Sequence, residues 1–461
     1  MGAGEIARGR PMANLLRLAV GVSFLLAPAA SVAATSAQAQ VDCARPTGTL
    51  RPLHGVNCGP VADGELVDLS AYYRELAIPY TRLHDCHWPN PDVVDIHTIF
   101  PDFRADPEAP ASYRFSRTDD YLKSIVAVGS QVVFRLGESI EHTRKKYYVT
   151  PPPDAEKWAA ICLGIIRHCN EGWANGSHLG IRYWEIWNEP ENRPAMWTGT
   201  DEDYFRLYTV AAKAIKVRFP NVLVGGPSLG YCGEVAGALL KPSAFASAFL
   251  QRCKAQSAPL DFFSWHRYTT DPSAFHQQAV AVRRFLDQNG FAKTESHLNE
   301  WNYLPRDDWT PLSLAGQGLM RQKFYEEMHG PAGAAFVACA LLFLQDSPVD
   351  VANYYRGDIG GFGMFTCNGV PEKTFYAFRA FKWLLDTPGR VATRGSVPGQ
   401  LAIGAGLSSD KTAGTVLISH FKSADEQLEL AVEHVPWEGP VICETFLRSI
   451  PSISTWPCCG S

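Results

Sequence analysis

Two short motifs in this chain each end in a glutamate next to a tryptophan. The first, YWEIWNEPE, spans residues 183–191, and the second, SHLNEWN, spans residues 296–302. The aromatic and β-branched residues that open the first motif favour a β-strand. Pro190 must end that strand, because proline has no N–H for the next rung of a sheet. We therefore expect Glu189 and Glu300 at the carboxyl ends of two strands.

Two carboxylates placed in this way suit the cleavage of a glycosidic bond. One glutamic acid donates a proton to the leaving oxygen, while the other attacks the sugar or activates water. Aromatic faces nearby would stack on the apolar C–H surface of a sugar ring. The two indoles beside Glu189 should exclude water and raise its pKa, so that it stays protonated as an acid. The alternative for Glu189 is a loop-capping role without chemistry.

The sequences WNEPE and NEWN resemble the motifs of glycoside hydrolase family 39. This family belongs to the clan of retaining (β/α)8-barrel glycosidases and includes β-xylosidases and α-L-iduronidases. The resemblance covers roughly residues 50–385. It implies that Glu189 is the acid/base after the fourth strand and that Glu300 is the nucleophile after the seventh.

The pattern from residue 50 onward alternates short apolar strands with amphipathic helices, which independently predicts a (β/α)8 TIM barrel. In such barrels the active site lies at the carboxyl ends of the strands. Helices are expected over residues 274–288, 314–328 and 372–385. The eight expected strands are 53–57, 80–84, 132–136, 183–187, 222–226, 262–266, 297–300 and 349–355.

Three segments are expected along the chain. Residues 1–39 read as a signal peptide, residues 50–388 as the catalytic barrel, and residues 389–461 as a small accessory β-sandwich. Short alternating runs separated by Gly, Ser and Asp predict the strands of that sandwich at 401–405, 414–420, 428–432 and 441–447. Residues 41–50 are a candidate additional strand of this second unit.

The expected signal peptide has three arginines, an apolar run over residues 18–30 and a small-x-small cleavage site at residues 37–39. The mature chain would begin at Gln40, or near residue 35 if cleavage follows Ala34, and the protein would be secreted or periplasmic. An uncleaved anchor is the alternative. No membrane span is expected after cleavage, and the apolar stretch 337–344 is expected to be a buried helix.

Several residues at the expected strand ends are candidates for binding substrate. The family resemblance implies that Arg82 lies under the nucleophile, that Asn188 binds the sugar 2-hydroxyl, and that His266 and Tyr268 lie near substrate and nucleophile. One pleat beyond Arg82, His84 would bind sugar hydroxyls. A structural role inside the barrel is the alternative for Arg82 and for His266.

Aromatic and charged residues next to these motifs complete the expected site. We expect Trp301 and Tyr355 to contact the sugar, Tyr355 standing where many clan members carry a tryptophan. Arg356 could recognise the carboxylate of a uronic acid, or could pair with Asp358 and be structural. Other candidates near the pocket are His87, Trp88 and Glu138, whereas Glu185 is expected to pair with an arginine and Glu191 to be exposed.

The composition excludes several other classes of function. The chain of 461 residues has a net charge of −5 and no basic tail, so nucleic acid is not an expected partner. Its 12 cysteines include no C-x-x-C spacing, and the histidines lack paired ligand spacing, so no metal and no cofactor are expected. Cys58 and Cys86 could meet at the barrel rim, and Cys458 or Cys459 could pair with Cys443 or Cys43; free thiols are the alternative.

The sequence therefore predicts a secreted retaining glycosidase that acts on an oligo- or polysaccharide, with β-xylosidase-like exo action. Alternatives are an iduronidase-like, uronide-specific enzyme and an endo-acting polysaccharide hydrolase. A non-catalytic carbohydrate-binding barrel would have lost one of the two carboxylates, and a metallohydrolase would need a ligand cluster at the strand ends.

Overall fold

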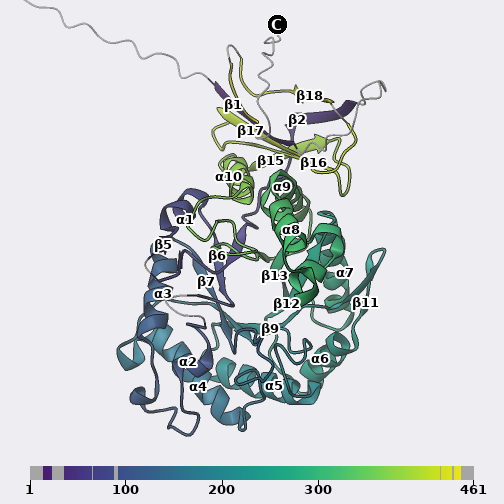
Figure 1. The fold of residues 1–461 in the computed structure, drawn as a ribbon. Coiled ribbons are helices and arrows are strands. Elements are labelled where there is room, and N and C mark those ends of the chain that lie inside the picture. The colour runs from purple at the N-terminus through teal and green to yellow at the C-terminus, as the bar shows by residue number, and fades with distance from the viewer. Residues whose placement is uncertain are drawn as a thin grey trace, which may run out of the picture. The chain divides into compact units, whose positions relative to one another are not determined.

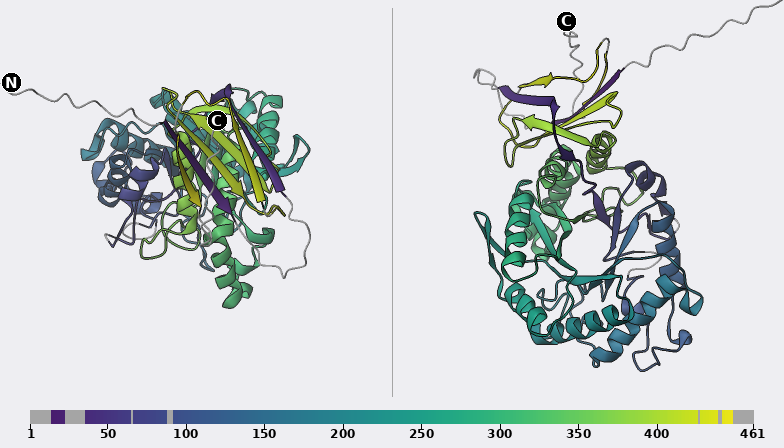
Figure 2. Two further views of the ribbon diagram at one scale, coloured as in Figure 1. Left: turned by 90° about the horizontal axis from the view of Figure 1, so that it is seen from above. Right: turned by 180° about the vertical axis from the view of Figure 1, so that it is seen from behind.

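The computed structural model describes residues 14–22, 36–64, 66–87, 92–425, 427–438 and 441–447. The chain forms two compact units, which Figures 1 and 2 show as ribbons. Pro52–Arg379 make up the first, and Met1–Arg51 together with Ala380–Ser461 make up the second. Each unit is described by itself.

Eight parallel strands close into a barrel in chain order, which confirms the predicted TIM barrel. The predicted strand positions hold, with ends that differ by a few residues. The strands are β3 (Gly55–Asn57), β6 (Tyr80–Leu83), β7 (Gln131–Leu136), β8 (Tyr183–Ile186), β9 (Leu223–Leu229), β12 (Phe262–Thr269), β13 (Glu295–Tyr303) and β14 (Val351–Tyr354).

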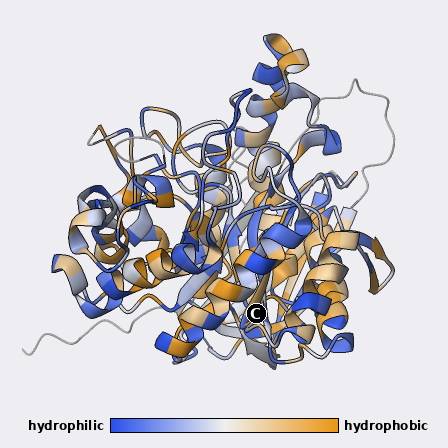
Figure 3. Cartoon of the chain, turned by 90° about the horizontal axis from the view of Figure 1, so that it is seen from below, coloured by the Kyte–Doolittle hydropathy of each residue, from blue (hydrophilic) through white to orange (hydrophobic). Residues whose placement is uncertain are grey.

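Helices surround the barrel strands (Figure 2). The longest begin at side-chain caps: Asp154 accepts a hydrogen bond from the backbone N–H of Lys157, and Thr200 forms a capping box with Asp203. Many helices alternate between hydrophobic and hydrophilic colours in Figure 3, as one buried face requires. They are α1 (Ser70–Leu76), α2 (Ile96–Ile99), α3 (Ser116–Ala127), α4 (Ala155–Glu171), α5 (Asp201–Arg218), α6 (Ala244–Ala255), α7 (Ala274–Gln288), α8 (Leu319–His329), α9 (Pro331–Leu344) and α10 (Lys373–Leu385).

Short elements decorate the loops of the barrel unit. Two antiparallel ribbons pair β4 (Val61–Ala62) with β5 (Val67–Asp68), and β10 (Gly233–Ala236) with β11 (Leu239–Pro242). Three 3-10 turns follow β13 over Pro305–Asp307, Thr310–Leu312 and Leu314–Gly316, and the third of them lies where the sequence predicted the start of a helix. The other two span Pro110–Ser112 and Trp173–Asn175.

Apolar side chains fill the barrel interior near the first residues of its strands. Val133, Tyr183, Phe262 and Val351 form one buried cluster there. Such a layer makes the barrel a packed core and not a pore. Polar side chains occupy the interior further along the strands, so the chemistry is confined to their carboxyl ends.

Two bulges interrupt the regular register of the barrel. The pairing of β12 with β9 shifts between Ser264 and Trp265, which leaves Ser228 as the extra residue of β9. The pairing of β12 with β13 shifts by one at the next step and leaves Asn299 as the extra residue of β13. A bulge re-aims the side chains that follow it, and bulges are common next to active sites.

The second unit holds one connected sheet of seven strands in the order β18-β2-β15-β16-β17-β1-β19. Its buried core consists of alternating aliphatic side chains, among them Val41, Val391, Ile403 and Ile418. Residues 41–49 belong to β2, which pairs antiparallel with β15 and parallel with β18. The strands are β1 (Asn14–Val22), β2 (Ser36–Thr49), β15 (Gly389–Arg394), β16 (Leu401–Leu407), β17 (Ala413–His420), β18 (Gln427–Glu433) and β19 (Val441–Leu447).

Parts of the expected signal peptide lie in this sheet. β1 pairs in parallel with both β17 and β19, and β2 begins at Ser36, four residues before the expected mature start. Residues 1–13 and 23–35 lie outside the described part of the chain. Cleavage after Ala39 remains a prediction.

Among the described residues, no single helix is long and apolar enough to span a membrane. The pair α8 and α9 reaches that length and composition only together, and it is bent by 47° at Gly330. The stretch expected as a buried helix, residues 337–344, is the second half of α9, where Val337, Leu341 and Leu344 are buried.

Candidate active site

The barrel brings the two predicted glutamates together at the carboxyl ends of its strands. Glu189 follows β8, and Glu300 lies in β13. One carboxylate oxygen of each lies within 4.8 Å of the other and of a ring nitrogen of His266. Only 7 % of Glu300 is exposed, so both groups interact in a largely dry site.

The turn after β8 holds Glu189 in an unusual backbone conformation. Trp187 (φ 70°) and Glu189 (φ 43°) both occupy the left-handed region, which is costly for residues with a side chain. The N–H of Glu189 donates to the carbonyl of Ser228 (3.0 Å), and the carbonyl of Glu189 accepts from the N–H of Asn192 (2.9 Å). These bonds fix the turn that carries the carboxyl group of Glu189.

Glu300 is held by a cation and a phenol. Arg82 Nη1 lies 3.3 Å from one of its oxygens, and the hydroxyl of Tyr268 donates to the other at 2.5 Å. Burial raises the pKa of Glu300, and the charge of Glu189 adds to this, although His266, Arg82 and Tyr268 act in the opposite direction. Arg82 and Tyr268 therefore orient the carboxylate of Glu300.

His266 is the main partner of Glu189. Its Nδ1 lies 2.8 Å from Oε1 of Glu189, and the amide of Asn192 donates to Oε2 at 2.9 Å. Burial raises the pKa of Glu189, but the hydrogen bond and the charge of His266 outweigh burial and lower it. Burial lowers the pKa of His266, but the two glutamates outweigh that effect and raise it.

The expectation that indoles raise the pKa of Glu189 is wrong. Trp187 is fully buried and packs against Trp197 and Trp158, with ring centroids 4.8 and 6.4 Å away, and its Nε1–H donates to a backbone carbonyl. Trp184 stacks on Phe134. The rings therefore support the turn from behind, while a histidine faces the carboxyl group.

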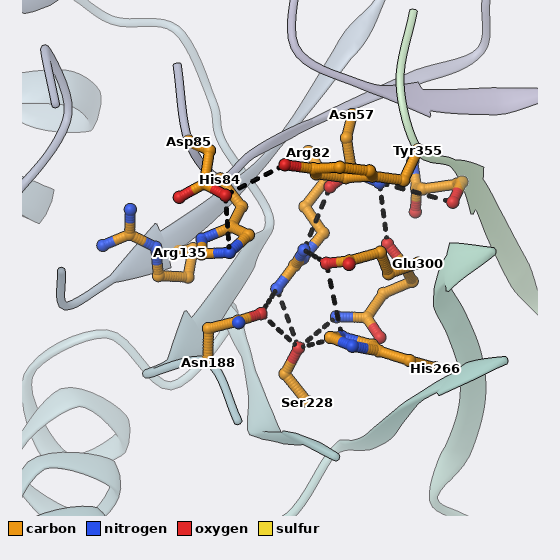
Figure 4. A network of polar contacts seen from close by, with 12 residues as sticks. Asn57, Arg82, His84, Asp85, Arg135, Asn188, Ser228, His266, Glu300 and Tyr355 are labelled. Atoms are coloured by element: carbon orange, nitrogen blue, oxygen red, sulfur yellow. Dashed lines mark hydrogen bonds and ion pairs between the residues drawn. The ribbon is translucent and has the colours of Figure 1, made fainter. Parts of the chain in front are cut away.

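Arg82 connects Glu300 with Asn57, Asn188 and Ser228 (Figure 4). It is fully buried, and each of its three nitrogens has at least one partner. Besides Glu300, it donates to Glu185 (2.7 Å), Asn57 (3.0 Å), Asn188 (2.6 Å) and Ser228 (2.8 Å). Glu185 is thus the partner of an arginine, as the sequence predicted, and Asn188 is tied to the same guanidinium.

His84 and Tyr355 meet at Asp85 on another side of the site (Figure 4). His84 Nε2 lies 3.4 Å from Asp85 Oδ2, and the hydroxyl of Tyr355 donates to the same oxygen at 2.9 Å. Burial lowers the pKa of His84 well below its usual range. Although burial alone raises the pKa of Asp85, His84 and the N–H of Ile140 bring it down to about 2. Asp85 is therefore a charged acceptor beside a neutral imidazole.

Trp301 does not reach the site, so its expected contact with sugar is wrong. It is fully buried and packs against Phe275 of α7 and Tyr354 of β14, with ring centroids 5.3 and 5.1 Å away. The bulge at Asn299 explains this. Because Asn299 and Glu300 both face the interior, the next side chain points outward.

Three charged residues that the sequence analysis singled out, Arg356, Glu138 and Glu191, have different partners in the structure. Arg356 is bound to Asp358, with Nη2 2.6 Å from Oδ2, which is the structural alternative weighed above. Glu138 accepts from His97 Nδ1 (2.6 Å), and burial raises the pKa of Glu138 to about 7. Glu191 is half-buried, contrary to expectation: the N–H of Tyr231 donates to its Oε1, and its Oε2 is buried.

Comparison with known proteins agrees with this architecture. Residues 66–387 match the family model described as Glycosyl hydrolases family 39. The chain belongs to this family. It is 25 % identical over 344 residues to a β-xylosidase of Caldicellulosiruptor saccharolyticus, a match that covers 66 % of this chain and 62 % of that protein. A β-xylosidase of Geobacillus stearothermophilus is also 25 % identical, over 319 residues, 62 % of this chain and 60 % of that protein.

Solved structures share the fold. A glucosidase from Croceicoccus marinus is 28 % identical and superposes with a TM-score of 0.69, over 82 % of this chain and 76 % of that one. A β-xylosidase from Caulobacter crescentus CB15 has a TM-score of 0.58 at 17 % identity, over 80 % and 77 % of the two chains. An α-L-arabinofuranosidase from Thermotoga maritima has the same score at 13 % identity, over 86 % and 88 %.

Some residues of this family 39 site were missed in the sequence. Ser228 and Asn299 are bulge residues, and an alternating strand pattern gives no sign of an extra residue. The run GGPS at residues 225–228 was the available signal for a break in β9. Trp309 lies in the loop after β13, half exposed, with its ring 5.0 Å from that of Tyr268.

Nine cysteines carry free thiols: Cys43, Cys58, Cys86, Cys162, Cys169, Cys232, Cys253, Cys339 and Cys367. Cys58 and Cys86 do meet at the rim, with sulfur atoms 4.0 Å apart. The C-terminal pair 458–459 lies outside the described residues, as does Trp88. His87 is exposed on its loop.

Two groups of side chains have the composition of a metal site. Their ligand atoms come within 4.8 Å in the sets Asp95–His97–Glu138 and Glu189–His266–Glu300. In the first set Arg135 binds Asp95 at 2.5 Å, and in the second Arg82 contacts Glu300. A guanidinium therefore already supplies positive charge to each set, and we assign no metal to either.

Proposed function

We propose that this chain is a retaining glycoside hydrolase that uses Glu300 as nucleophile and Glu189 as acid/base. The observation that carries the proposal is the close approach of these carboxylates, with oxygens within 4.8 Å at the ends of β8 and β13. Retaining enzymes place their carboxyl groups about 5–5.5 Å apart, whereas inverting enzymes need about 6.5–9.5 Å to admit water.

Two steps complete the reaction. An oxygen of Glu300 bonds to the anomeric carbon as the bond to the leaving oxygen breaks, and Glu189 gives that oxygen its proton. Glu189 then takes a proton from water, whose oxygen displaces Glu300 from the sugar. Arg82 and Tyr268 orient Glu300 and stabilise its charge.

The substrate is proposed to be a β-D-xyloside or a related pentoside, cleaved from the chain end. The two β-xylosidases to which the chain is similar support this choice. The match to the C. marinus glucosidase makes a glucoside the second candidate. A uronide is less favoured, because the guanidinium of Arg356 is already bound to Asp358.

A panel of nitrophenyl glycosides tests the substrate. It comprises β-xylose, β-glucose, α-L-arabinose, β-galactose, β-glucuronic acid and α-L-iduronic acid. We expect the highest kcat/KM on the β-xyloside. Preference for a uronide would overturn the pentoside proposal, and cleavage of a long polymer without activity on the panel would indicate endo action.

Replacing each glutamate by alanine separates their roles. Glu189→Ala should lose about 10²–10⁴-fold on substrates with poor leaving groups, and much less on activated aryl glycosides, because only the former need the proton. Azide should partly rescue this variant, whereas Glu300→Ala should be inactive on both kinds of substrate. Equal losses in the two variants on all substrates would contradict the assignment.

A further inference from the structure

The hydroxyl of Ser228 lies between Arg82, Asn188 and His266 in the polar network of the site (Figure 4). Ser228 is the bulge residue of β9, is fully buried and has a φ of 59°. Its Oγ is within hydrogen-bonding distance of Arg82 Nη2 (2.8 Å), Asn299 Nδ2 (2.8 Å), Asn188 Oδ1 (2.9 Å) and His266 Nε2 (2.7 Å). A hydroxyl has one hydrogen and two lone pairs, so it can make three hydrogen bonds among these four contacts.

Two of the neighbours can only donate. Arginine has no acceptor. The amide of Asn299 presents its nitrogen, because the same Nδ2 also donates to the carboxylate of Glu185 at 2.6 Å. Both lone pairs of the Ser228 oxygen are therefore occupied, and its hydrogen remains for a single acceptor.

That acceptor is His266 Nε2. Asn188 Oδ1, the other candidate, accepts from Arg82 at 2.6 Å and has a second lone pair, but it lies farther from Oγ (2.9 Å) than His266 Nε2 does (2.7 Å). A hydrogen on Nε2 would instead point at an oxygen whose lone pairs are both in use. The next acceptor, Oε2 of Glu300, is 3.6 Å from Nε2, beyond hydrogen-bonding distance.

The state of the ring then follows. With Nε2 unprotonated, the single hydrogen of a neutral imidazole sits on Nδ1. Nδ1–H donates to Oε1 of Glu189 at 2.8 Å. The proton that Glu189 exchanges with substrate must therefore be carried by Oε2.

We propose that Ser228 is a positioning residue that fixes His266 as the neutral Nδ1–H tautomer and so reserves Oε2 of Glu189 for the catalytic proton. The inference rests on the proposed role of Glu189 as acid/base. Ser228 also receives a hydrogen bond from Arg82, so one hydroxyl connects the arginine under the nucleophile to the histidine that holds the acid.

The charges around His266 make such a restraint necessary. Glu189 after β8 and Glu300 in β13 favour a second proton on the ring, while Arg82 in β6 opposes it. Glu191 and His84 also interact electrostatically with His266. Without the hydrogen from Ser228, Nε2 would be free to take up a proton and turn toward Glu300.

Nitrogen chemical shifts of the histidine ring test this directly. In ¹⁵N-histidine-labelled protein, the His266 signals are assigned by their loss in His266→Gln. Ser228→Ala removes the hydroxyl, and Ser228→Gly removes it while tolerating the positive φ, which keeps the test valid if the alanine variant folds poorly. Ser296→Ala is the matched control, a buried barrel serine whose Oγ accepts from Trp265 instead.

We expect a protonated Nδ1 and an unprotonated Nε2 in the native enzyme and in Ser296→Ala. Both Ser228 variants should show two protonated nitrogens, a kcat/KM lower by about 10- to 100-fold, and an alkaline limb of the pH profile at lower pH. A native His266 protonated at Nε2, or ring shifts unchanged in both Ser228 variants, would overturn the inference. The nitrogen shifts are measured in the free enzyme. They therefore test the tautomer of His266 separately from the proposed reaction.

Discussion

At the scale of single residues, the sequence located both carboxylates but not the groups that tune them. The order WNEPE followed by NEWN places two glutamates at strand ends, and the structure brings them together. The expected source of tuning was the neighbouring indoles. It is instead His266, 77 positions away in the chain from Glu189, and contacts at that separation are not encoded in local pattern.

Gly230 provides a test of how tightly Glu189 is positioned. A Cβ on Gly230 would lie 2.4 Å from Oε1 of Glu189, too close for the carboxyl group to stay in place. Gly230→Ala should therefore lower kcat/KM by about 10- to 100-fold on poor leaving groups, with a smaller effect on activated ones. The control is Gly414→Ala in the accessory sheet, where the nearest atoms are 3.3 Å away. Unchanged kinetics in Gly230→Ala would contradict this position of Glu189.

Glu191 should make stability depend on pH. Burial and the charge of Glu189 raise its pKa from the ordinary 4.5 to about 8. In that range the folded chain binds the proton more strongly than the unfolded chain, so the wild type loses stability as the pH rises from 4.5 to about 8. Glu191→Gln removes the titration, so its melting temperature should exceed that of the wild type by a margin that grows over this range. Glu234→Gln, on the exposed ribbon β10, should show no growing margin; a constant margin for Glu191→Gln would contradict the assignment.

At the scale of elements, the alternation of strands and helices was sufficient to predict all eight barrel strands in order. Periodicity could not predict the bulges in β9 and β13, because each adds one residue without changing the kind of side chain around it. The consequence is largest in β13, where one extra residue reverses the side on which Trp301 lies.

Trp301 should accordingly contribute to stability and not to substrate binding. Trp301→Phe leaves space between β13 and α7 and should lower the free energy of unfolding by about 1–3 kcal/mol, as measured by denaturant titration. KM should not change. Trp309→Ala, on the exposed ring beside Tyr268, should give the reverse pattern, with a higher KM and little loss of stability. A higher KM for Trp301→Phe with native stability would instead support the expectation that Trp301 contacts the sugar.

At the scale of the whole molecule, the sequence separated a barrel from a second β unit, and the structure has two compact units. The first residues are where expectation and structure differ most. A basic segment, an apolar run and a small-x-small site indicate export, yet β1 occupies a place in the seven-stranded sheet between β17 and β19. An exposed sheet edge readily pairs with an apolar segment, so this pairing does not distinguish a permanent strand from a leader.

We propose that the leader is removed on export. The secreted or periplasmic protein should then begin near Gln40 and retain the part of β2 that pairs with β15, because the paired residues run from Gln40 to Thr49. β1 would be absent from the mature sheet. Mass spectrometry of the exported protein measures this, and a mature chain that begins at Met1 or within residues 2–20 would show that β1 is a permanent strand.

The most direct test of the central proposal is the configuration of the first product formed. Proton NMR during hydrolysis of a β-xyloside, or of the best substrate in the panel, records the sugar anomer before mutarotation. The approach of Glu189 and Glu300 to within 4.8 Å leads us to expect the anomer of the substrate to appear first. If the opposite anomer appears first, water attacks the sugar directly, and the two-glutamate double displacement is wrong.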